Sequence, residues 1–104
     1  MNRHYYIHRV SCKVHNKKTQ ALDAALTRFN FTLVEFSDTF TPDGMFALLQ
    51  NIVKEVNTKG KSREIDVRKD EFSDTISFTF YEVPNNGEAA ASFSLYPVLS
   101  YIKQ

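Results

Sequence analysis

Three histidines and one cysteine near the start of the chain are the side chains best suited to chemistry. His4, His8, His15 and Cys12 all lie within the first fifteen residues, and imidazole and thiolate are common metal ligands, bases and nucleophiles. His4 and His8 share one face of a strand but lie about 13 Å apart along it. That separation is too large for one metal ion, and no Asp or Glu precedes Asp23. We therefore expect ordinary surface or hydrogen-bonded histidines, with no metal site.

A catalytic site is not expected either. Cys12 falls in mid-strand on the face that we expect to be inward, together with His8 and Val10, where an inert buried thiol is usual. None of the serines lies in a nucleophile-elbow pattern. One alternative stays open: a small-ligand protein, or an enzyme of unspecified reaction, whose pocket between sheet and helices uses His8 and Cys12. We predict no catalytic residue and no cofactor.

Two short segments resemble binding loops only superficially. Residues 59–62 read Lys-Gly-Lys-Ser, but a phosphate loop follows a strand and precedes a helix, whereas this segment follows a predicted helix. Asp70, Glu71 and Asp74 are close in sequence but lack the spacing and the glycine of a calcium loop. Both segments are expected to be turns or solvated edges.

The first thirty residues are locally basic. They contain six Lys and Arg residues against Asp23 alone, interleaved with Tyr5 and Tyr6. Cations bind phosphates and aromatic rings stack on bases, so a nucleic-acid-binding protein is an alternative function. Its candidate residues are Arg3, Tyr5, Arg9, Lys13, Lys17 and Lys18.

Composition narrows the protein class. The 104 residues carry 13 basic and 12 acidic side chains and are 42% hydrophobic. The balance excludes a disordered polyelectrolyte and a strongly basic nucleic-acid-coating protein, and the length fits a single domain over 1–104. The longest core-like apolar run has about five residues, whereas a membrane span needs about 20. With one cysteine and no apolar run before His8 and Arg9, we expect neither a signal peptide nor a membrane, and a cytoplasmic location.

Hydrophobic spacing predicts the first four elements. Residues 5–14 alternate as a strand, with Tyr6, His8 and Val10 on one face and Tyr5 and Ile7 on the other. A helix over 17–29 follows Asn16 as N-cap, and residues 31–36 form a second strand. Thr41-Pro42-Asp43 starts a second helix over 42–58, with Gly60 as its left-handed C-cap residue.

The last third of the chain changes to a period of two. Alternation predicts strands over 63–68, 75–81 and 89–96, with an Asn-Gly hairpin turn in residues 84–87. Pro97 limits the last strand to a sheet edge or ends it. The apolar tail, residues 98–104, is expected to dock on the domain.

The resulting order, β-α-β-α-β-β-β, predicts an α+β two-layer sandwich in the ferredoxin-like neighbourhood. Both helices would cover one face of a mostly antiparallel sheet, with a parallel first β-α-β unit and a right-handed crossover. The chain is rich in aromatic residues, with nine Phe and five Tyr. An uncovered sheet face would therefore expose some of them.

Exposed apolar patches usually mark binding or self-association surfaces. We accordingly expect a small non-catalytic module that binds or inhibits a partner protein, or forms a homodimer, through this face. The candidate partner-binding residues are Tyr5, Ile7, Tyr81 and Phe93.

Overall fold

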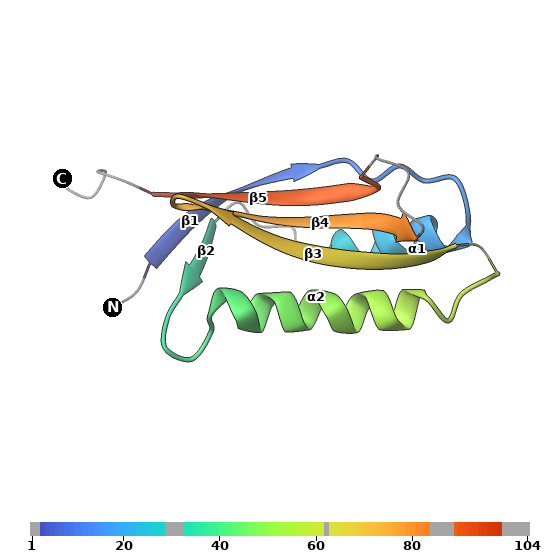
Figure 1. Cartoon of the computed structure of the whole chain (residues 1–104), viewed down its shortest axis with the longest axis horizontal. Coiled ribbons are helices and arrows are strands. Elements are labelled where there is room, and N and C mark those ends of the chain that lie inside the picture. Colours follow the sequence, from blue (N-terminus) through green and yellow to red (C-terminus); the bar gives the residue numbers. More distant parts are fainter. Residues whose placement is uncertain (1–2, 29–32, 62, 84–88, 99–104) are drawn as a thin grey trace.

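The elements follow the predicted order. The computed structural model describes residues 3–28, 33–61, 63–83 and 89–98. Within these ranges the chain forms an α+β fold with five strands and two helices (Figure 1). In order these are β1 (Arg3–Val10), α1 (Lys17–Leu26), β2 (Leu33–Phe36), α2 (Pro42–Val56), β3 (Glu64–Phe72), β4 (Thr75–Val83) and β5 (Ala91–Pro97).

The strands form one sheet in the order β2-β1-β5-β4-β3, and every neighbouring pair is antiparallel. The meander of the last three strands is confirmed. Of the two alternatives for Pro97 the second holds, because β5 lies in the middle of the sheet and ends at Pro97. The predicted parallel pairing of the first two strands is wrong. Helix α1 has 10 residues and returns the chain only about 15 Å, whereas β1 is about 26 Å long. Strand β2 therefore begins opposite Tyr6, halfway along β1. Its register runs from there back to Arg3, so the two strands are antiparallel.

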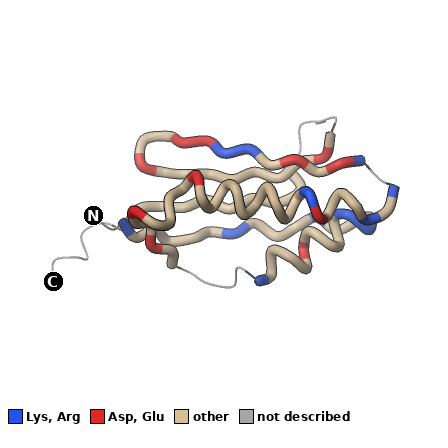
Figure 2. The backbone as a smooth tube through the Cα atoms, turned by 90° about the horizontal axis from the view of Figure 1, so that it is seen from below, with Lys and Arg blue, Asp and Glu red and all other residues tan. Residues whose placement is uncertain are grey.

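Both helices lie against the same face of the sheet, as predicted. Figure 2 shows them from below, in front of the strands. The core between the layers consists of alternate strand residues and the apolar stripes of the helices. Its largest fully buried members include Phe78, Phe80, Phe93, Leu22 and Leu49.

The helix boundaries follow their capping residues. Asn16 and Thr19 form a reciprocal capping box at the start of α1, and the Thr41 hydroxyl accepts a hydrogen bond from the Gly44 N–H at 3.1 Å. Helix α1 ends at Leu26, three residues earlier than predicted, and α2 ends at Val56. Gly60 does adopt a left-handed φ of 63°, but in the turn beyond the helix rather than as its C-cap.

The β3–β4 hairpin is longer than its sequence pattern predicts. Its nine-residue strands pair in continuous register from Glu64↔Val83 to Phe72↔Thr75, because pairing with β4 extends β3 through the charged residues 69–71. Ser73 makes the turn with a left-handed φ of 52°. The predicted turn at 84–87 and the tail beyond Val98 lie outside the described residues.

Candidate functional site

The side of the sheet opposite the helices, which we call the open face, carries the candidate site. Side chains on a strand alternate between faces, and burial identifies the covered set: Tyr5, Val34, Ile65, Phe78 and Phe93 are all at most 8% exposed. The open face therefore takes the intervening residues. From β2 to β3 they include Leu33, Tyr6, His8, Val10, Tyr96, Ser94, Ser92, Thr75, Ser77, Thr79, Tyr81, Phe72, Asp70 and Arg68.

A row of large side chains crosses this face from edge to edge. Leu33 pairs with Tyr6, and Tyr6 pairs with Tyr96. The β5–β4 register then places Thr75 beside Tyr96, and Thr75 pairs with Phe72. Leu33, Tyr6, Tyr96 and Phe72 are 44%, 53%, 47% and 68% exposed. We call these four residues the apolar stripe.

Small hydroxyl side chains lie directly beside the stripe. Ser94 pairs with Ser77, and Ser92 pairs with Thr79, on the two central strands. These four residues, the hydroxyl belt, are flanked by His8 and Val10 on β1. The belt makes a low strip next to the raised stripe, because Ser and Thr project less far from a sheet than Tyr and Phe.

Most of the charge on the open face lies on β3; at the opposite margin Glu35 Oε1, on β2, lies 3.8 Å from His4 Nε2. On β3, Arg68 Nε lies 2.8 Å from Asp70 Oδ2, and the Arg68 guanidinium lies 6.0 Å from the centre of the Tyr81 ring. Figure 2 shows the charged residues of β3 following one long side of the molecule. Charged side chains are typical of edge strands that avoid pairing with other chains.

The predicted partner-binding residues are distributed differently from the expectation. Tyr5 and Phe93 are 3% and 1% exposed and belong to the core, and Ile7 packs against that core. Their placement on the uncovered face was wrong. For Tyr5 and Ile7 the reason is that β1 carries apolar side chains on both faces, and only the helix packing decides which is buried. Phe93 lies between two serines on β5, and that alternation already marks it as buried. Tyr5 instead packs edge-on against Phe36, with ring centres 5.3 Å apart. Tyr81 does lie on the open face, where its hydroxyl is 3.4 Å from Asp66 Oδ2.

The sequence pattern missed most of the stripe. The alternation of residues 5–14 predicts an inward Tyr6, together with His8 and Val10, and it indicates nothing about Leu33, Phe72 or Tyr96. Their signal was present as the alternate positions of the same strands. Each strand has two sets of alternate residues, one on each face. Which set is exposed depends on the side of the sheet on which the helices pack.

The basic candidates for nucleic acid do not form one surface. Tyr5 and Lys18 are buried, and Arg9 lies on the helix side, where its guanidinium is 3.2 Å from Asp23 Oδ1. Arg3 and Lys13 lie at and beyond opposite ends of β1. Lys17 lies against Gly60 and therefore near Lys59 and Lys61. These three lysines form a small basic cluster that the sequence pattern did not indicate.

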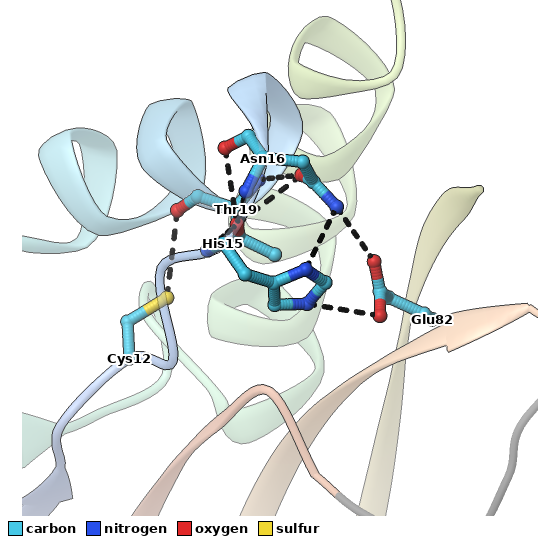
Figure 3. Close-up of polar contacts among 5 residues, drawn as sticks. All are labelled: Cys12, His15, Asn16, Thr19 and Glu82. Carbon is cyan, nitrogen blue, oxygen red and sulfur yellow. Dashed lines mark hydrogen bonds and ion pairs between the residues drawn. The ribbon is translucent and has the colours of Figure 1, made fainter. Parts of the chain in front are cut away.

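His8 and Cys12 are also separated. His8 lies on the open face, whereas the Cys12 thiol donates to the Thr19 carbonyl of α1 at 3.5 Å (Figure 3). Burial, with a smaller contribution from Asp23, raises the pKa of Cys12 to about 11. The thiol is therefore protonated at neutral pH, unlike the thiolate of a nucleophilic cysteine.

A polar network beside Cys12 has a structural role. His15 Nε2 lies 3.2 Å from Glu82 Oε1, and the Asn16 amide donates to Glu82 Oε2 at 3.0 Å (Figure 3). Thr19 Oγ1 accepts from the backbone N–H groups of His15 and Asn16 at 2.9 and 3.0 Å. These contacts tie the start of α1 to β4.

Two shallow hollows lie on the helix side of the molecule. The larger, about 420 Å³, lies between α2 and β3, and its lining residues include Val53 and Lys54 of α2 and Ile65 and Glu64 of β3. The other, about 280 Å³, is bordered by Arg3, Phe36 and Pro42. Neither contains a histidine or cysteine.

The described ranges hold neither a metal-ligand cluster nor a membrane-spanning helix. Among these residues no cluster of three or more His, Cys, Asp or Glu side chains is arranged to hold a metal ion. Neither described helix has the length and apolar character needed to cross a bilayer.

Comparison of the chain with protein-family models, curated proteins and solved structures finds no match.

Proposed function

We propose that this chain is a non-catalytic protein-interaction module that binds through the apolar stripe. The stripe carries the proposal: three of its four members are aromatic, and all are exposed by 44% or more. Exposed apolar residues are common singly, but a row of them, here interrupted only by Thr75 on β4, is typical of an interface. Aromatic side chains in particular are enriched at the buried centre of protein interfaces.

The energetics require a partner that covers more than the stripe. Burying a large apolar side chain contributes about 1.5–3 kcal/mol, so four half-exposed ones contribute roughly 3–6 kcal/mol. Association itself costs about 4–15 kcal/mol. A binding partner must therefore also cover the hydroxyl belt, whose short side chains allow close approach.

The near-neutral charge supports a protein partner over a polyanion. The chain has a net charge of +1, and the basic residues considered for nucleic acid are divided among different parts of the structure. A nucleic-acid function therefore has less support than a protein function, and an enzyme has least, since His8 and Cys12 lie apart.

The test is capture from a lysate of the native host with three tagged baits. These are the wild-type chain, the double variant Tyr6→Thr/Phe72→Thr and the control Leu48→Gln. Thr retains β propensity, and Leu48 is an exposed apolar residue (47%) on α2, away from the open face. We expect wild type and L48Q to retain a near-stoichiometric protein that the double variant loses.

Two results would contradict the proposal. Equal capture by all three baits would show that the stripe is not the binding surface. Loss of the captured material on nuclease treatment would favour the nucleic-acid alternative.

A further inference from the structure

We propose that the partner is a second copy of this chain, packed open face to open face about a two-fold axis that runs along β5. This inference rests on the proposed function and names its partner. It is carried by the position of the apolar stripe relative to the middle strand, by the charges beside it and by the partly blocked edge of β3.

The stripe is arranged symmetrically about β5. With the strand order β2-β1-β5-β4-β3, a rotation about β5 brings β1 of one copy over β4 of the other, and β2 over β3. Leu33 then faces Phe72 of the second copy, and Tyr96 faces its own equivalent. Tyr6 faces Thr75, a large side chain over a small one. One surface thereby complements itself, as a two-fold interface requires.

The next two rows fit the same arrangement. Val10 would face Thr79 of the second copy, and His8 would face Ser77, which lies beside Asp70. Among the described residues of these two rows, no charge of one copy therefore faces a like charge of the other. Ser92 and Ser94 lie on the axis itself. Packed sheets approach to about 10 Å and turn by about 30°, so the correspondence is closest near β5.

The area of the face suits a dimer. Alternate positions on five strands supply roughly twenty side chains, and a standard interface uses about 20–30 residues from each partner. A second copy offers a matching surface of equal extent.

Association through the outer edge of β3 is disfavoured. The Asn57 side chain accepts from the Ile65 N–H at 2.7 Å and donates to the Ile65 carbonyl at 2.9 Å. Asp66 Oδ1 accepts from the Val67 N–H at 2.8 Å. These backbone groups would otherwise pair with another strand, so their occupation disfavours strand pairing at the start of the β3 edge.

A charge-exchange experiment at Ser94 tests the axis. Ser94 is expected to meet its own equivalent, so Ser94→Asp and Ser94→Lys each oppose two like charges across the interface. By sedimentation equilibrium we expect the wild type to dimerise and each variant alone to associate at least about tenfold more weakly. An equimolar mixture of the two should recover the dimer. Ser94→Asn, which is uncharged and similar in size to Asp, is the matched control, and thermal unfolding verifies that each variant folds.

Three results would show that the partner is not a second copy. The wild type could be monomeric, both charged variants could associate as strongly as the wild type, or their mixture could associate no more strongly than either variant alone. The wild type could be monomeric and still capture another protein from the lysate. If the Tyr6→Thr/Phe72→Thr bait fails to capture that protein, the second copy is wrong as partner but the proposed function stands. If that double variant changes neither self-association nor capture, both fail.

Discussion

The side-chain amide of Asn57 pairs with both backbone polar groups of Ile65, at 2.7 and 2.9 Å. Asn57 is the C-cap residue of α2, and Ile65 is the second residue of the edge strand β3. The amide thus takes the place of a neighbouring strand and holds the helix end against the sheet. The contact protects the start of the β3 edge. It also fixes the point at which the chain, after leaving β2 and passing through α2, returns to the sheet as β3.

Replacing Asn57 should destabilise the protein. Asn57→Ala leaves two partly buried backbone groups without their partner, and we expect a loss of about 1–3 kcal/mol in the free energy of unfolding. Urea denaturation measures this loss, with Asn51→Ala on the exposed side of α2 as control. An N57A midpoint equal to that of N51A would show that the pairing contributes nothing.

The capping box predicts a similar loss at Thr19. The Thr19 hydroxyl accepts from two backbone N–H groups, and the residue is fully buried. Thr19→Val keeps the shape but removes the acceptor, and it should cost about 1–2 kcal/mol by thermal or urea unfolding. Thr19→Ser, which keeps the hydroxyl, should retain more stability than T19V. The reverse order would indicate that packing, not the cap, dominates at this position.

Cys12 predicts a pH dependence in the alkaline range. The folded pKa is raised from 9.0 to about 11, so between these values the folded thiol keeps a proton that the unfolded thiol loses. The native state then binds more protons, and stability must fall as pH rises through this interval. Urea midpoints at pH 8 and 10.5 should drop further for the wild type than for Cys12→Ser. Equal drops would mean that other groups account for the whole effect.

Lys69 connects β3 to the start of α2. Its ammonium contacts Asp43 and Glu71, and the hydrogen bond to Asp43 is the main cause of the raised pKa of Lys69. Because the Asp43 side chain is 83% exposed, a double-mutant cycle of Lys69→Met and Asp43→Asn should give a coupling of only about 0.2–1 kcal/mol. The coupling should shrink in high salt. A coupling that salt leaves unchanged would rule out a solvent-screened pair.

Local patterns predicted the elements well because their causes are local. The Thr41-Pro42-Asp43 start of α2 and the alternation of residues 75–81 depend on capping chemistry and on strand periodicity alone. The lengths were less accurate where pairing with a distant strand decided them. Residues 69–72 became strand only through their register with residues 75–78.

The amino-acid sequence alone determined the α+β class, the order of elements and the alternation that gives each strand two distinct faces. Only the tertiary structure decided that β1 and β2 are antiparallel, that β5 is central and that Tyr5 is buried while Tyr6 is exposed. The reason is that β1 carries aromatic and apolar side chains on both faces. Neither face is marked by its own composition, and the side on which the helices pack makes one the core and the other the candidate interface.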